Sequence, residues 1–240
     1  MVSRIRRVDG QVPEGRLWSD RGKVAHVRVG GLVHNVVRVS VSVLGAVAMT
    51  YQFAKLNGAA EFSEGNFFSF FTIQSNIFAA TMLVMAALVR RNERSLLFDA
   101  VRGAATFYIT ITFAVFALFL SGLQEQLDTH ISFVNFVVHY FVPVVLLVDW
   151  FLDPPQHRLG LRVAAAWLAY PVVWFAYTLV RGGAVDWYPY PFVDVARHGH
   201  GRVLANGFGF TLAFALGAVL FTTVSDRRSG SRRGPAIEAS

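Results

Sequence analysis

The sequence lacks cysteine and has few charged residues. With no cysteine among 240 residues, disulfide bonds and cysteine-ligated metal sites are excluded. Charged residues make up only 15% of the chain, whereas hydrophobic residues make up 54% and include 22 phenylalanines. This composition is too apolar for an ordinary soluble domain. The sequence therefore predicts a membrane protein.

Lysine and internal repeats are also scarce. Lys23 lies near the N-terminus and Lys55 at the edge of an apolar stretch. A retinal protein needs a lysine embedded in the membrane for its Schiff base, so that class is excluded. Many transporters contain inverted repeats with helices broken at corresponding positions. Pro143 and Pro171 give no such symmetry, which makes transport the weaker interpretation.

Six apolar stretches reach the length of roughly 20 residues that a helix needs to cross a bilayer. None alternates as a membrane strand would, so we expect an all-α bundle of six transmembrane helices. The six-span domain is predicted over residues 30–224, between disordered basic tails at 1–29 and 225–240. The expected spans are 30–54, 67–89, 99–122, 133–152, 162–181 and 203–224.

The net charge of +7 has a simple explanation in the distribution of arginine and lysine. Sixteen of these residues lie in the two tails and in the loops on the same side of the membrane, and four lie in the opposite loops. This bias follows the positive-inside rule and predicts that both termini are cytoplasmic. Nucleic acid is therefore not an expected partner.

The second span carries an unusual number of polar groups in "FFSFFTIQSNIF", residues 67–78. Counting about 1.5 Å per residue from the non-cytoplasmic boundary places Thr72 roughly 7 Å deep and His139 of the fourth span roughly 9 Å deep. Ser75 and Asn76 share a helix face with Thr72, whereas Gln74 points away. Such polar groups can also serve only to hold helices together, and the sequence leaves this open.

The matching depth of Thr72 and His139 suggests an intramembrane ester hydrolase. A base can activate a hydroxyl for attack on a lipid ester, and Asn76 could donate to the oxyanion, with Ser75 as further support. Asn135 or Tyr177 could fix the histidine tautomer. Ionisable groups at this depth usually mark a functional site, although a structural histidine is an alternative. A second alternative is a non-catalytic lipid-binding or transport protein.

Other polar residues suggest different roles. Arg38 and Asp149 lie at comparable depths near the cytoplasmic side and are predicted either to form a structural ion pair or to extend toward the lipid headgroups. Loop residues supply a weaker metal-site hypothesis. They are Asp128, His130, Asp194, His198 and His200. Neither a metal nor any other cofactor is predicted.

Three motifs carry a family resemblance. "FFTIQSN", "HYFVPVVLLVDW" and "YPYPFVDV" resemble, in order and spacing, the androgen-inducible and androgen-dependent TFPI-regulating membrane proteins and their bacterial relatives. The resemblance covers about residues 30–224. It implies a multispanning hydrolase of fatty acid esters of hydroxy fatty acids, with Thr72 as nucleophile and His139 as its partner. We expect the protein in the inner membrane of a bacterium, with a lipid substrate that reaches the site from the outer leaflet. The segment 188–195 is expected to form a structured loop that caps the site. No oligomeric state is predicted.

Overall fold

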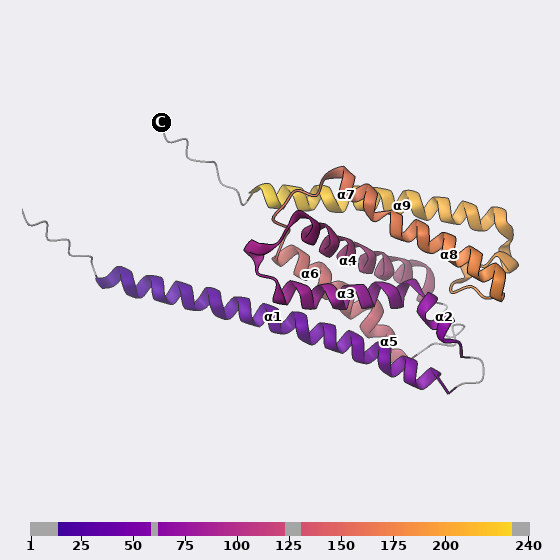
Figure 1. The fold of residues 1–240 in the computed structure, drawn as a ribbon, viewed down its shortest axis with the longest axis horizontal. Coiled ribbons are helices and arrows are strands. Elements are labelled where there is room, and N and C mark those ends of the chain that lie inside the picture. The colour runs from indigo at the N-terminus through magenta and orange to yellow at the C-terminus, as the bar shows by residue number, and fades with distance from the viewer. Residues whose placement is uncertain (1–13, 59–61, 123–130, 232–240) are drawn as a thin grey trace, which may run out of the picture.

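The computed structural model describes residues 14–58, 62–122 and 131–231. No strand occurs in this part of the chain, which forms a bundle of long, roughly parallel helices (Figure 1). Six helices are long and apolar enough to cross a membrane, as the sequence predicts. They are Gly31–Leu56, Phe71–Leu88, Leu96–Leu120, Ser132–Leu152, Gly160–Val185 and Val195–Ser229. The chain thus has the architecture of an integral membrane protein.

Several spans are built from more than one helical segment. The first span belongs to α1 (Glu14–Leu56) and the second is α3 (Phe71–Leu88), with the short helix α2 (Glu64–Ser69) between them. A 3₁₀ turn, Arg91–Glu93, follows α3. The third is α4 (Leu96–Val115) with a π-helical turn, Phe116–Leu120. The fourth joins α5 (Ser132–Phe136), a π-helical turn (Val137–Phe141) and α6 (Val142–Leu152). The fifth joins α7 (Gly160–Trp167) to α8 (Ala169–Val185), and a 3₁₀ turn, Pro191–Val193, leads to α9 (Val195–Ser231).

The helices pack in chain order around two hydrophobic clusters. Helix α1 packs along α3, α3 along α4, and α4 along α6, while α9 packs on α7 and α8. One cluster joins apolar residues of α1, α3 and the fourth span. The other is rich in aromatic residues of α4, α7, α8 and α9. The start of α1 and the end of α9 lie at the same end of the bundle, here called the terminal end (Figure 1).

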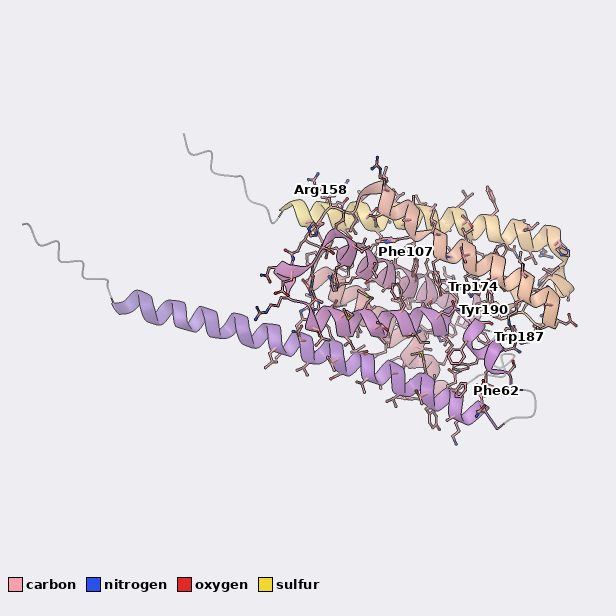
Figure 2. The ribbon with its side chains drawn as sticks, in the orientation of Figure 1. Phe62, Phe107, Arg158, Trp174, Trp187 and Tyr190 are labelled. Atoms are coloured by element: carbon pink, nitrogen blue, oxygen red, sulfur yellow. The ribbon has the colours of Figure 1, made fainter. Side chains whose placement is uncertain are left out.

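Labelled side chains distinguish the two ends of the bundle (Figure 2). Phe62, Trp187 and Tyr190 lie toward the end opposite the termini, here called the distal end, while Arg158 lies toward the terminal end. Aromatic residues are typical of the boundary between hydrocarbon and water.

The structure differs from the expected disordered tails. Helix α1 begins at Glu14 and α9 continues to Ser231, so parts of the segments 1–29 and 225–240 are helical. A helix that has already formed gains a hydrogen bond with each added residue, which favours extension beyond the membrane. At the end of α9, Ser229 donates to the Pro155 carbonyl, and Asp226 accepts from the Leu159 and Gly160 N–H groups. These contacts hold the last turns of α9 against the loop between α6 and α7.

Candidate active site

Thr72 lies at the beginning of a helix rather than in the middle of one. The sequence predicts a continuous span over 67–89, but the chain breaks at Phe70, which has extended backbone angles (φ −65°, ψ 128°) between α2 and α3. The first N–H groups of a helix have no carbonyl partner within it, and the helix dipole makes this end positive. The break therefore places the Thr72 hydroxyl beside a backbone end that favours negative charge.

His139 lies in a π-helical turn. Pro143 has no N–H, so the carbonyl of His139 lacks its ordinary helical partner, and the backbone widens over Val137–Phe141. The imidazole stacks on Phe116, with ring centroids 3.8 Å apart and planes 20° apart. Phe116 itself begins the π-helical turn at the end of α4. Two irregular turns thus face each other at the site, where such turns are frequent in functional proteins.

The structure brings Thr72 and His139 into contact. Thr72 Oγ1 lies 3.3 Å from His139 Nε2, and His139 Nδ1 lies 3.2 Å from the Asn135 carbonyl oxygen. A carbonyl oxygen only accepts, so Nδ1 carries the proton of the neutral imidazole. Nε2 then has a free lone pair that accepts the Thr72 proton. A hydroxyl facing an unprotonated histidine nitrogen is the arrangement that general-base catalysis requires.

Tyr190 completes the hydrogen bonding of Thr72. Its hydroxyl lies 3.3 Å from both Thr72 N and Thr72 Oγ1. The Thr72 N–H donates to the phenol oxygen, and the phenol donates to Thr72 Oγ1 because the threonine proton is directed to His139. Burial raises the pKa of Tyr190, while its hydrogen bonds to Thr72 act in the opposite direction. The phenol therefore stays protonated and able to donate near neutral pH.

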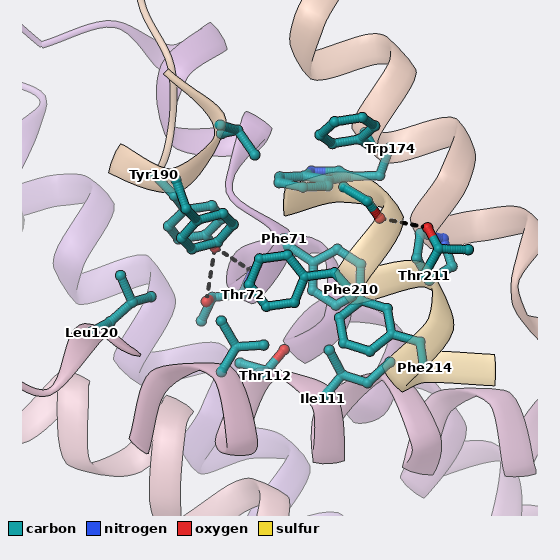
Figure 3. Close-up of a pocket in the computed structure, with 16 residues that line it drawn as sticks. Phe71, Thr72, Ile111, Thr112, Leu120, Trp174, Tyr190, Phe210, Thr211 and Phe214 are labelled. Atoms are coloured by element: carbon teal, nitrogen blue, oxygen red, sulfur yellow. Dashed lines mark hydrogen bonds between the residues drawn. The ribbon is translucent and has the colours of Figure 1, made fainter. Parts of the chain in front are cut away.

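A small apolar pocket lies beside these groups. Its volume is about 70 Å³, and Figure 3 shows Tyr190 directed at Thr72 across one wall of it. Thr72, Thr112 and Thr211 add hydroxyl groups to a lining that is otherwise mostly aromatic and aliphatic. The aromatic lining residues are Phe71, Trp174, Phe175, Tyr190, Phe192, Phe210 and Phe214. Such a pocket suits a mostly apolar ligand with one polar group at Thr72.

Asn76 does not occupy the oxyanion position expected of it. Its amide nitrogen donates to the Thr72 carbonyl (2.9 Å) and to the Val138 carbonyl (3.1 Å). Its Oδ1 is buried and has no hydrogen-bond partner among the described residues. Both donors are thus used to join the turn of Thr72 to the residue before His139. Asn76 is a positioning residue for the pair rather than a donor into the pocket.

Of the other residues expected to support the pair, Asn135 contacts His139, whereas Ser75 and Tyr177 do not. Ser75 bonds to the Thr72 carbonyl (3.1 Å) and to Thr112 Oγ1 (2.8 Å), so its contacts are structural. Asn135 contacts His139 as expected, but through its backbone carbonyl rather than its side chain. Tyr177 instead contacts Ser69, with the two hydroxyl oxygens 2.9 Å apart. Tyr177 therefore has no part in orienting the imidazole.

A second polar region lies at the terminal end. Arg38 and Asp149, the predicted structural ion pair, are in contact through Arg38 Nε and Asp149 Oδ1 at 2.6 Å. Asp153 joins them, 2.6 Å from Arg38 Nη2, and Arg102 Nη2 lies 2.8 Å from Asp149 Oδ2. Arg94 contacts Asp153 at 2.7 Å. These five residues, with Arg91 against Asp153 and His34 against Asp149, form the charge cluster.

Backbone carbonyls balance the excess of arginines in the charge cluster. Arg38 and Arg94 both donate to the Ala86 carbonyl in the last turn of α3. Arg102 donates to the carbonyls of Asp149 and Asp153 at the end of α6. The C-terminal end of a helix carries partial negative charge, so it stabilises nearby cations. The cluster is therefore a structural anchor whose charges are compensated internally.

The residues expected to form a loop metal site make no metal centre in the described part of the chain, where no group of three or more histidine, cysteine or acidic side chains lies close enough to hold an ion. His198 and His200 lie in α9 rather than in a loop. Asp194 instead accepts from the Arg197 N–H, as a local turn contact. Asp128 and His130 lie outside the described residues.

Among known protein families, curated proteins and solved structures, none matches this chain.

Proposed function

We propose that this protein is an intramembrane hydrolase of lipid-like esters, with Thr72 as the nucleophile and His139 as the general base. The observation that carries the proposal is the contact of 3.3 Å between Thr72 Oγ1 and His139 Nε2 at the edge of an apolar pocket. Threonine is a weak nucleophile on its own and needs an adjacent base, which this contact supplies.

The first half of the reaction forms an acyl-enzyme. Thr72 Oγ1 attacks the carbonyl carbon of the ester while His139 Nε2 takes the hydroxyl proton. The tetrahedral intermediate collapses when the bond from the carbonyl carbon to the alcohol oxygen breaks, and His139 returns the proton to that oxygen. Water then attacks the acyl-threonine, His139 takes its proton, and the same proton returns to Thr72 as the carboxylic acid leaves.

The negative charge of the intermediate would be held by two groups. The Tyr190 hydroxyl and the Thr72 N–H lie 3.3 Å apart, and both donors are at the positive end of α3. In the free protein the Thr72 N–H donates to the Tyr190 oxygen, and the Tyr190 hydroxyl donates to Thr72 Oγ1. When the oxyanion forms, the Tyr190 hydroxyl and the Thr72 N–H can both donate to it instead. These hydrogen bonds would then stabilise the transition state more than the bound substrate.

The substrate class follows from the site's depth and from the family resemblance. With both termini cytoplasmic, as the charge bias favours, the distal end faces away from the cytoplasm and the site lies in the outer leaflet. The resemblance to the androgen-inducible and androgen-dependent TFPI-regulating proteins favours fatty acid esters of hydroxy fatty acids or similar lipids. The same resemblance to bacterial relatives favours the inner membrane of a bacterium.

Labelling with a fluorophosphonate, which captures activated hydroxyl groups, tests the proposal. Wild type and Thr72→Ser are expected to be labelled, whereas Thr72→Ala and His139→Ala are not. Thr81→Ala is the matched control. Thr81 also lies on α3, and its hydroxyl donates to the Ile77 carbonyl of the same helix (2.9 Å). Equal labelling of Thr72→Ala and wild type would refute the nucleophile. No labelling of folded wild type would favour the non-catalytic lipid-binding alternative.

A further inference from the structure

A second, larger cavity opens on the side of the bundle between α4 and α9. Its volume is about 580 Å³, within the range of ligand sites. Its lining is mostly apolar, and Leu118, Gly209 and Ala213 at its edge are exposed on the face that meets the membrane. We call this cavity the α4–α9 groove. Its lining residues are Phe107, Thr110, Ile111, Ala114, Val115, Leu118, Phe119, Ala205, Asn206, Gly209, Phe210, Ala213, Phe214 and Gly217.

Small side chains on α9 create the groove. Four of them follow one another at intervals of four residues, so they share one face of the helix. They are Ala205, Gly209, Ala213 and Gly217. A Cβ atom placed on Gly209 would meet no atom within 4 Å, so no neighbouring side chain fills this space. Ala114 on the facing helix is also small, and the two helices leave an open channel between them.

The groove adjoins the pocket of Thr72. Ile111, Val115, Phe210 and Phe214 line both cavities, so these side chains are the wall between them. The pocket, at about 70 Å³, is smaller than an engineered cavity of about 150 Å³ that binds benzene. It can hold the ester group of a substrate but not a long chain. The acyl chain of a substrate whose ester group lies in the pocket would extend into the adjacent groove.

The length of the groove matches one leaflet. Its lining on α9 runs from Ala205 to Gly217, about 18 Å at 1.5 Å per residue. The hydrocarbon core is about 30 Å thick, so one leaflet contributes about half of that. A helix from a second copy would cross the whole core, whereas an acyl chain occupies one leaflet. Asn206 donates to the Phe192 carbonyl (3.0 Å), so its amide nitrogen bonds to the protein at the distal end of the groove.

We infer that the α4–α9 groove holds one acyl chain of a membrane lipid, with its terminal methyl toward Gly217 and its carbonyl end passing Phe210 toward Thr72. This inference rests on the proposed function for the identity of the reacting end. It adds that the substrate enters the site laterally from the bilayer, and that the groove along α9 determines which acyl chain lengths are accepted.

Photolabelling tests the occupant without turnover. The probe is palmitic acid carrying a diazirine near its terminal methyl, added to protein in phosphatidylcholine vesicles. We expect labelled peptides from 209–217 above the level of lipid-facing peptides of α1, in wild type and in Thr72→Ala alike. Ala213→Leu and Gly209→Leu should reduce groove labelling to that of α1. Ala46→Leu is the matched control, since Ala46 is exposed on α1 and away from the groove.

Two labelling results would overturn the inference. One is groove labelling no higher than that of α1, or unaffected by both substitutions. The other is a cross-linked dimer of wild type that Ala213→Leu converts to monomer, which would assign the groove to a second copy of the chain.

A chain-length assay separates this inference from the proposed function. The measured quantity is the ratio of turnover for the nitrophenyl esters of palmitate and butyrate. We expect this ratio to fall about tenfold in Ala213→Leu, the order of discrimination that apolar pockets give, and to stay at the wild-type value in Ala46→Leu. An unchanged ratio in an active Ala213→Leu would refute the groove and leave the hydrolase standing. Groove labelling in a wild type that hydrolyses neither ester would refute the hydrolase and leave the groove standing.

Discussion

The two polar regions of this bundle differ in the lengths of their central hydrogen bonds and in the space beside them. In the charge cluster at the terminal end, Arg38 lies 2.6 Å from both Asp149 and Asp153. Most of the other arginine donors bond to carboxylates or backbone carbonyls, while Arg94 Nε is buried without a partner among the described residues. At the distal end, Thr72 Oγ1 lies 3.3 Å from each of its two partners, beside an open pocket. Both regions are buried in an apolar bundle. Only the second has long hydrogen bonds next to space for a ligand.

This difference indicates which region is structural and which is reactive. A buried network whose charged groups are largely hydrogen-bonded rigidifies a fold and leaves little for a ligand. Catalytic hydrogen bonds are often long in the free enzyme and tighten only with substrate or in the transition state. Burial and unusual polarity are common to both regions, so neither property identifies the site. The distinguishing features are the bond lengths and the adjacent cavity.

The largest expected effect is on the reactive region. His139→Ala should lower ester hydrolysis by about two to four orders of magnitude, because the general base is lost. The thermal unfolding temperature in detergent should change little, since the charge cluster is untouched. Turnover of a butyrate ester and unfolding, measured on the same preparation, check both statements. His200→Ala, an exposed substitution near the beginning of α9, is the control. Near-normal turnover in His139→Ala would remove the histidine from the mechanism.

The opposite result is expected in the charge cluster. Asp149→Ala leaves Arg38 and Arg102 without their shared carboxylate, which costs about 3–5 kcal/mol in the free energy of unfolding. The yield of folded protein and its unfolding temperature should drop, and activity per folded molecule should remain. A stable Asp149→Ala protein with lost activity would reverse the assignment of the two regions.

Tyr190→Phe tests the oxyanion donor. Removing the hydroxyl should lower turnover by about 100- to 1,000-fold, the usual cost of losing such a donor. Stability should fall by only about 0.5–1.5 kcal/mol, since one neutral hydrogen-bonding group is lost while the ring keeps its packing. Steady-state kinetics with a butyrate ester separate these effects. A loss confined to KM would mean that Tyr190 only binds the substrate.

Much of the outline follows from the sequence alone. The six spans are readable because their apolar stretches have the length that a bilayer demands. The meeting of Thr72 and His139 follows from the constant rise of helices that enter from the same side. The pair of Arg38 and Asp149 follows by the same reasoning. In each case, the depth of a residue in the membrane predicts which residues of other spans lie at the same level.

The details of the site depend on contacts between residues far apart in the chain, which a single sequence does not reveal. The break at Phe70 has no proline or glycine to mark it. In the structure Phe70 packs edge-on against Trp187 and Tyr190, from a loop more than a hundred positions away. The direction of the Asn76 amide depends on the Val138 carbonyl of another span. The "YPYPFVDV" motif was a signal for a cap, but it could not tell which of its tyrosines reaches Thr72.

The charge cluster should also give the protein a dependence on pH. Burial alone would raise the pKa of Asp153, but the charge of Arg102 and hydrogen bonds from Arg38 and Arg94 outweigh it and hold that pKa well below its usual range. A depressed carboxyl pKa contributes stability above the unfolded value of about 3.9, and this contribution is lost as the pH falls below it. The unfolding temperature should therefore decrease on acidification. Asp153→Asn should flatten that dependence, and an identical acid slope in the variant would contradict the assignment.

The smallest expected effect separates Tyr177 from Tyr190. Tyr177 lies in a membrane span near the distal end and was a reasonable candidate for orienting the imidazole, but its hydroxyl meets Ser69 at 2.9 Å. Tyr177→Phe should therefore cost about 0.5–1.5 kcal/mol of stability, the value of one hydrogen bond. Turnover should stay near that of wild type, because His139 keeps the Asn135 carbonyl and Thr72 as its partners. Parallel assays of Tyr177→Phe and Tyr190→Phe compare a phenol on an exposed residue that contacts Ser69 with a buried phenol that contacts Thr72. If both variants lost turnover equally, loosened packing at the distal end would explain the loss better than an oxyanion donor.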